Sequence, residues 1–212
     1  MKTEYFLRKE LVETCKRMYQ RGFIAATDGN VSIKVNENRI LFTPSGICKG
    51  FLEPDQIIVT DKTGNKIAGK GKVTTEIFMH LAAYQERPDI NAVVHGHPPT
   101  TIAFTFANID FEKYLLPEVV ITLGSIPVIP YELTGTYELA SGIKPFIKNA
   151  DAVVLEKHGV VAVGKDVFDA YYKLEKVEHN AHIFYMAKQL GNIYPLTNEQ
   201  LKDLHILRAK MK

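Results

Sequence analysis

The segment NAVVHGHPPT, residues 91–100, carries two histidines one residue apart at the end of an apolar, β-branched run. Alternate side chains of a strand point to the same face, so we expect the imidazoles of His95 and His97 to lie side by side. Zinc in catalytic sites commonly takes three protein ligands and leaves one position open for water or substrate. The spacing indicates two ligands of such a site, although two polar residues can also simply finish a strand before Pro98.

A third ligand must come from elsewhere in the chain, and His158 is one candidate. It lies in LEKHGVV, in a turn between two apolar runs, where a polar side chain can emerge at the sheet end that binds ligands in open sheets. The alternative for His158 is a solvated turn residue. The competing cluster is LEKVEHNAH, in which Glu178 and His182 lie four residues apart. A di-iron bundle would need more carboxylate-bearing helices than this chain offers, so we interpret EHNAH as a charged helix face.

Glu76 stands at the start of a predicted helix, TTEIFMHLAAYQERP, directly after two threonines. Hydroxyls and free N–H groups at a helix start can hold an anion, and the helix dipole also favours a simple carboxylate there. His80, four residues on, shares the face of Glu76 and is expected to orient it or to pack. The loops TDGNVS and TPSG, each typical of an ordinary turn, add further neutral donors. Together these groups suit a phosphate or a polyol.

Composition excludes several classes of partner. A chain of 212 residues is long enough for one domain spanning 1–212. Its net charge of +2, without any basic run, argues against nucleic acid or a membrane surface as partner. Two cysteines without a CxxC motif fit the reducing cytoplasm. No apolar run of transmembrane length occurs, and charges interrupt the N-terminus, so neither a spanning helix nor a signal peptide is predicted.

The elements that must position these residues alternate between strands and helices, which is typical of an α/β or α+β fold. Periodicity predicts a helical stripe of Ile77, Phe78, Leu81 and Ala82. The predicted helices cover residues 4–20, 74–88, 98–108, 134–150, 166–190 and 198–212. The predicted strands cover residues 31–35, 40–42, 57–60, 66–68, 92–95, 119–123, 126–129, 152–155 and 160–163.

The segments GNVS, TPSG, TTE, AVVHGHPP and KHGVVAVG, in this order and spacing, resemble the class II aldolase/adducin family from about residue 5 to about residue 190. The resemblance implies a three-layer α/β/α fold around a mainly antiparallel sheet, and a homotetramer with active sites at subunit interfaces. It implies that His95, His97 and His158 ligate zinc. It also implies that Glu76 ligates the resting metal and acts as the acid/base. The implied substrate-binding residues are Gly29, Asn30, Ser45, Gly46, Thr74 and Thr75.

The activity that the resemblance implies is that of a zinc-dependent aldolase, a lyase of carbohydrate metabolism. Such an enzyme reversibly splits a phosphorylated ketose similar to L-fuculose 1-phosphate into dihydroxyacetone phosphate and a short aldehyde such as L-lactaldehyde. Cleavage beside a ketone leaves an enediolate, which zinc held by neutral histidines can stabilise without a lysine Schiff base. A carboxylate displaced from the metal is then placed to move the proton.

Other members of the family provide the alternatives: L-ribulose-5-phosphate 4-epimerase, methylthioribulose-1-phosphate dehydratase and the non-catalytic interaction module of adducin. The epimerases usually carry Asp where this chain has Glu76, and a scaffold has no need of the metal residues, so we favour an aldolase. The chain also departs from the family's aldolases. An apolar residue stands where a neighbouring subunit would supply a tyrosine, and neither Tyr114 nor Glu118 is assigned as its substitute. No tyrosine follows Tyr194 to match the family's C-terminal one.

Overall fold

The computed structural model of the chain describes residues 2–113 and 115–211, and within them one eight-stranded sheet has the order β4-β3-β2-β1-β5-β8-β7-β6. Neighbouring strands are antiparallel except β6 and β7, which are parallel. The mainly antiparallel sheet is therefore confirmed. The strands are β1 (Asn30–Asn36), β2 (Arg39–Phe42), β3 (Ile58–Thr60), β4 (Lys66–Ala68), β5 (Ala92–Gly96), β6 (Val128–Ile129), β7 (Ala152–Leu155) and β8 (Gly159–Gly164).

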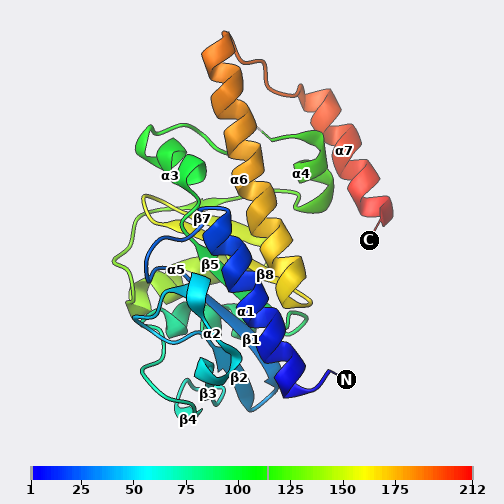
Figure 1. Cartoon of the computed structure of the whole chain (residues 1–212). Helices are drawn as coiled ribbons and strands as arrows, with labels where there is room; N and C mark the ends of the chain where they lie inside the picture. The colour runs from blue at the N-terminus through cyan, green and yellow to red at the C-terminus, as the bar shows by residue number, and fades with distance from the viewer. Residues whose placement is uncertain (1, 114, 212) are drawn as a thin grey trace.

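Helices cover both faces of this sheet, which confirms the three-layer architecture. The helices α1, α3, α4 and α6 contribute to the core on one face, and α2 and α5 form the core on the other. Figure 1 shows α1 and α6 lying across the front of the sheet, with α7 beside α4. The α-helices are α1 (Glu4–Gln20), α2 (Ile77–Glu86), α3 (Pro99–Phe106), α4 (Pro117–Thr122), α5 (Tyr137–Ile147), α6 (Val167–Leu190) and α7 (Asn198–Met211), and short 3-10 turns occupy Lys49–Phe51 and Pro54–Gln56.

Side chains along a strand alternate between the two faces of the sheet, and this alternation determines the face to which each residue points. In β5, Ala92 and Val94 lie in the core under α1 and α6, whereas Val93 lies in the core under α2 and α5. His95 follows Val93 by two residues and therefore points to the α2 face. The strand thus directs this histidine toward the start of α2.

Of the two strands predicted between residues 119 and 129, one was wrong and the other was too long. Residues 119–122 lie in helix α4 rather than in a strand, and Leu123 is its C-cap, because Pro117 at the first helical position presets a helical φ and a short apolar run cannot distinguish a strand from a buried helix. The predicted strand 126–129 is reduced to Val128 and Ile129, since Pro127 has no N–H to pair. By contrast, Pro145 lies inside α5 without ending it.

The predicted buried stripe of α2 was wrong in one residue. Phe78 is 45% exposed, and its ring contacts that of Tyr137 on α5 with the two centroids 6.2 Å apart. Ile77, Leu81 and Ala82 are buried as predicted. The core requires only a stripe of the helix surface, and Phe78 falls at the edge of that stripe.

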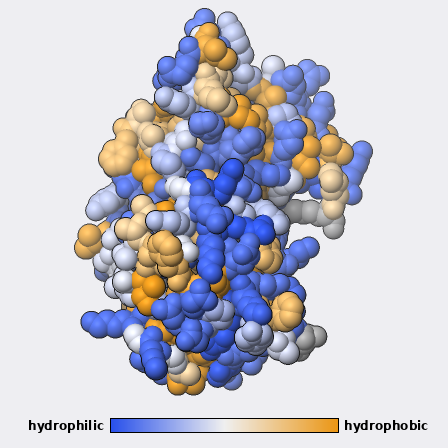
Figure 2. All heavy atoms as spheres, viewed as in Figure 1, coloured by the Kyte–Doolittle hydropathy of each residue, from blue (hydrophilic) through white to orange (hydrophobic). Residues whose placement is uncertain are grey.

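Among the described residues, no helix is both long enough and apolar enough to cross a membrane. Figure 2 shows hydrophilic side chains over much of the face formed by α1 and α6, with hydrophobic atoms scattered between them.

Candidate active site

Three histidines meet at one end of the sheet because adjacent strands end or turn there. His95 lies in β5 between its partners Asn30 of β1 and Val161 of β8. His97 lies just beyond β5, where its backbone N–H donates to the Phe23 carbonyl at 2.6 Å. The turn between β7 and β8 supplies the third imidazole, that of His158. The ring centroids of the three histidines lie 4.8–5.2 Å apart.

Glycine is required where these rings approach the backbone. A Cβ at Gly159, directly after His158, would meet the Gly96 carbonyl and lie 2.9 Å from Cδ2 of His97. The neighbouring rings and backbone would have to move to admit it. In the sequence KHG, His158 is therefore one of the three histidines, and Gly159 leaves room for the rings of the other two, His95 and His97.

The ring nitrogens of the three histidines converge on one point. One ligand nitrogen from each lies within 4.8 Å of the others, and Nε2 of His95 lies 3.1 Å from Nε2 of His97. The other ring nitrogen of His95 faces the Val160 carbonyl at 3.0 Å, so Nδ1–H donates there and Nε2 keeps its lone pair. This is the tautomer that a metal ligand requires.

Glu76, the residue directly before α2, adds a carboxylate to the three imidazoles as the fourth possible metal ligand. One of its carboxylate oxygens, Oε2, lies 3.3 Å from Nε2 of His95, and the other, Oε1, lies 3.2 Å from Nε2 of His158. The Asn30 amide also donates to Oε2 at 2.8 Å. The structure therefore brings together all four residues that the sequence analysis expected to hold a metal.

These residues fit a zinc ion. Ligand atoms about 2.0–2.1 Å from a tetrahedral zinc lie about 3.3 Å from one another. Three pairs of these donors are close to that value, at 3.1, 3.2 and 3.3 Å, and the ligand nitrogens of the three histidines all lie within 4.8 Å of one another. Oε1 of Glu76 and Nδ1 of His158 are buried and make no hydrogen bond within the described residues. A buried carboxylate oxygen without a hydrogen-bond donor indicates a missing partner, and a cation satisfies it.

Burial sets the protonation of this cluster. It lowers the pKa of His95 to about 3, and it also lowers the pKa of His97. Both imidazoles are thus neutral near pH 7, the form that binds a metal. Burial by itself would raise the pKa of the Glu76 carboxyl, but its polar neighbours, among them the donating Asn30 amide, lower this pKa by more, so Glu76 is a carboxylate.

The predicted phosphate loops lie together beside Glu76. An isolated bridge pairs Pro44 with Val73, and the backbone N–H of Ser45 donates to the Lys72 carbonyl at 2.9 Å. These contacts bring the TPSG loop to Thr74 and Thr75. Gly46 is exposed, and a side chain added there would meet nothing within 4 Å. The loops therefore form an open rim of small residues at the N-terminal start of α2.

The GNVS segment approaches the same place from β1. Gly29 has a φ of +67°, and a Cβ at this position would meet the side chain of Ile24 and lie 3.0 Å from the His95 carbonyl. The loop before it is anchored by Lys49, a buried lysine whose Nζ donates to the Thr27 carbonyl at 2.5 Å. Burial lowers the pKa of this ammonium. Lys49 was not singled out in the sequence, where the segment CKG gives no sign of burial.

Glu178 has a role that the interpretation of EHNAH as a charged face did not anticipate. Its buried carboxylate accepts hydrogen bonds from the backbone N–H groups of Thr100 and Thr101 at 2.9 and 2.8 Å, and from the Thr101 hydroxyl at 2.8 Å. Pro98 at the N-cap of α3 offers no capping side chain. Glu178 on α6 therefore caps the helix that follows His97.

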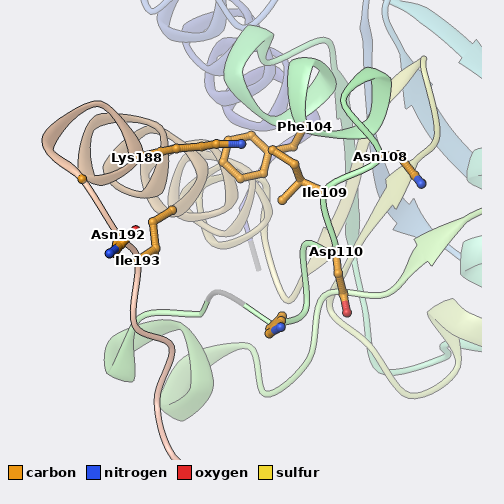
Figure 3. A pocket seen from close by; sticks show the side chains of 9 residues that line it. Phe104, Asn108, Ile109, Asp110, Lys188, Asn192 and Ile193 are labelled. Carbon is orange, nitrogen blue, oxygen red and sulfur yellow. The ribbon is translucent and has the colours of Figure 1, made fainter.

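The remaining candidates lie elsewhere. His179 and His182 of the EHNAH segment are exposed, as a charged face predicts. Glu118 is exposed on α4, and Tyr114 lies outside the described residues. A separate cavity of about 480 Å³ lies between the end of α3 and the C-terminal end of α6. Figure 3 shows Phe104, Lys188 and Asn192 at this cavity, whose lining contains none of the predicted site residues.

Comparison with known proteins agrees with this geometry. The family described as Class II Aldolase and Adducin N-terminal domain matches residues 9–185. An L-fuculose phosphate aldolase of Methanococcus maripaludis is 38% identical over 180 residues, which cover 85% of this chain and 96% of the relative. A 3-oxo-tetronate 4-phosphate decarboxylase of Haemophilus influenzae is 32% identical over 206 residues, covering 95% and 97%. A solved L-fuculose 1-phosphate aldolase matches with a TM-score of 0.85 at 27% identity, covering 94% of each chain.

The match of the family covers the sheet, the three histidines, Glu76 and the loops around them. The relatives are matched over nearly their whole length. The chain belongs to the class II aldolase and adducin family.

Proposed function

We propose that the protein is a zinc-dependent aldolase that reversibly cleaves a ketose 1-phosphate, with L-fuculose 1-phosphate as first candidate, to dihydroxyacetone phosphate and L-lactaldehyde. One observation carries this proposal: three histidines and a carboxylate converge beside a rim of small hydrogen-bonding residues, and three pairs of their donor atoms lie 3.1–3.3 Å apart. The aldolase relative, 38% identical over 85% of this chain, supports the choice of reaction.

The metal and the protein side chains have different roles in the proposed reaction. A divalent ion, when bound, polarises the substrate ketone and stabilises the enediolate left when the carbon–carbon bond breaks. His95, His97 and His158 would hold this ion, and since an imidazole that ligates a metal is neutral, they would leave its charge undiminished. Glu76 moves a proton to and from the enediolate carbon, using the oxygen that makes no hydrogen bond within the described residues.

The loops determine which carbon reacts. The proposed phosphate ligands offer hydroxyl, amide and backbone N–H groups next to Glu76. A phosphate held there fixes the distance from its ester oxygen to the reacting carbon, and such positioning supplies a large part of many rate enhancements. These ligands are Asn30, Ser45, Gly46, Thr74 and Thr75, with Gly29 beside them.

A second candidate is the decarboxylation of 3-oxo-tetronate 4-phosphate, favoured by the relative of that name that aligns over 95% of this chain. Loss of the carboxylate as CO₂ leaves the electron pair of the broken bond on the carbon beside the ketone. This is the enediolate that the aldolase also forms, and one proton, which the Glu76 carboxylate takes from water and passes on, converts it to dihydroxyacetone phosphate. The same catalytic groups therefore serve either reaction.

The second product distinguishes the two candidates. Zinc-loaded protein is incubated with L-fuculose 1-phosphate or with 3-oxo-tetronate 4-phosphate, and dihydroxyacetone phosphate is followed through a reductase that oxidises NADH. The proposal expects release from the first substrate, together with L-lactaldehyde, and no release after chelation. Release from the second substrate alone, together with CO₂, would replace the aldolase by the decarboxylase.

A homotetramer with active sites at subunit interfaces is part of the proposal. Four large apolar residues are exposed near the site: Phe78, Tyr131, Leu133 and Tyr137. The loop before α5, which contains Tyr131 and Leu133, approaches the site, since a Cβ at Gly135 would lie 3.5 Å from that of Thr75. Light scattering on a sizing column tests this: the wild type should have the mass of four chains, and Phe78→Glu should lower it. A wild-type monomer with full activity would exclude shared sites.

A further inference from the structure

A continuous chain of buried polar side chains runs from Tyr84 to Glu76. The Tyr84 hydroxyl lies 2.8 Å from Oγ of Ser32, and this Oγ lies 2.7 Å from Nδ1 of His80. The Nε2 of His80 lies 2.5 Å from Oδ1 of Asn30, whose Nδ2 donates to Glu76. None of the four residues behind Glu76 is more than 9% exposed.

The regular geometry of two elements creates this chain. Glu76, His80 and Tyr84 are spaced four residues apart and so share one face along α2, whereas Asn30 and Ser32 share one face of β1. Four residues of helix rise about 6 Å, and two residues of strand rise about 6.7 Å. The two steps nearly match, so side chains from helix and strand alternate along the chain without a gap.

The hydrogen bonds of this chain can run in one direction only. The Glu76 carboxylate accepts and cannot donate, so the N–H₂ group of Asn30 must face it and Oδ1 must face His80. Oδ1 accepts, so Nε2 of His80 carries the proton. In a neutral imidazole Nδ1 then accepts from the Ser32 hydroxyl, whose oxygen accepts from Tyr84. Burial lowers the pKa of His80 to about 4, which keeps the ring neutral near pH 7.

We propose that His80, Ser32 and Tyr84 are positioning residues, which lock the Asn30 amide with its N–H₂ group toward Glu76 and thereby orient the Glu76 carboxylate. Asn30 holds Oε2, and the carboxylate then presents Oε1 to His158. His80 itself exchanges no proton with substrate, because both ring nitrogens are engaged and the ring is fully buried. The catalytic value of this orientation rests on the proposed function, whereas the orientation itself does not.

Removing the donor from His80 should release the lock. Without Nε2–H, the buried Oδ1 of Asn30 has no donor, so the amide is held only by its bond to Glu76 and can move together with that carboxylate. Substitutions in the shell behind metal ligands typically cost 10–100-fold in metal affinity or activity. We expect His80→Leu to lower zinc affinity, measured by competition with a chromophoric chelator, about tenfold and kcat by about 10–100-fold.

The other variants grade the effect. The amide of His80→Gln can donate to Asn30 and should restore part of what His80→Leu loses. Tyr84→Phe removes only the far hydroxyl and should cost kcat about twofold to tenfold, the equivalent of one hydrogen bond. Tyr171→Phe is the matched control, since this buried tyrosine bonds Glu175 outside the chain. It should leave both zinc affinity and kcat unchanged.

The tautomer of His80 provides a test without substrate. Long-range ¹H–¹⁵N NMR of the metal-free protein at pH 7, with the His80 signals identified by their loss in His80→Gln, should show a protonated Nε2 and an unprotonated Nδ1. The opposite tautomer, or an unchanged zinc affinity in folded His80→Leu, would overturn the proposal. If neither substrate is cleaved, the function is wrong, and the tautomer and zinc affinity still decide the positioning role.

Discussion

Replacing Glu178 by alanine should destabilise the protein by about 3 kcal/mol. The carboxylate holds two backbone N–H groups and one hydroxyl at the start of α3, and Thr101, which contributes two of these donors, is fully buried. A buried donor left without a partner costs about 1–3 kcal/mol, and loss of a helix cap costs about 0.5–2 kcal/mol. These ranges overlap for the same groups, so about 3 kcal/mol is the expected total. Glu178→Gln keeps one acceptor and should lose less.

Urea unfolding of the metal-free protein measures this free energy. Glu175→Ala is the control: this carboxylate lies one turn earlier on α6, pairs with exposed Arg21 at 3.2 Å and accepts from the Tyr171 hydroxyl at 3.1 Å, so its loss should lower the free energy of unfolding by only about 1 kcal/mol. Because α3 begins two residues after His97, Glu178→Ala should also bind zinc more weakly. A free energy of unfolding within about 0.5 kcal/mol of the wild type would refute the capping role.

Three further perturbations test separate parts of the structure. Gly159→Ala should lower the free energy of unfolding by about 1–3 kcal/mol, because the added methyl crowds the histidine rings. Gly142→Ala in α5, where nothing lies closer than 4.0 Å, should raise this free energy by about 0.5–1 kcal/mol. The reverse order would contradict the steric argument. His97→Ala should lose most of its zinc by elemental analysis yet keep a native circular dichroism spectrum, and one zinc per chain would exclude this ligand. Burial would raise the pKa of the Asp151 carboxyl, but Lys173 and Arg87 lower this pKa by more. The contribution of Asp151 to stability is therefore complete above the pKa of the unfolded state, about 3.9, and is lost as pH falls through the lower pKa of the folded state. Asp151→Asn should therefore be less stable than wild type at pH 7 and similar to it in strong acid, which urea unfolding at both pH values checks.

The sequence predicts most of this fold because its hydrophobic periodicity is regular and turn residues mark the ends of most elements. The N-terminal helix, the hairpin of β1 and β2, and the strands around His158 were confirmed with nearly their predicted bounds. The region before β6 was not, since a short run such as Val119–Ile121 fits a strand and a buried helix equally well. Packing of this run against α6 and α7 adds to the effect of Pro117 and favours the helix.

The candidate site, like the fold, could be predicted only in part from the sequence. The HxH spacing indicated His95 and His97 from local geometry alone, but His158 was one candidate of several until the family resemblance selected it. Glu178 and Lys49 act through partners far away in the sequence, Thr101 and Thr27. Such contacts leave no local pattern, because only the tertiary fold brings the two segments together.

Zinc-edge anomalous diffraction from crystals grown with zinc tests the central claim most directly. The account predicts one strong peak among the Nε2 atoms of His95 and His97, the His158 ring and the Glu76 carboxylate. A structure in which zinc is bound only elsewhere, with these four side chains still pointing at one another, would contradict it.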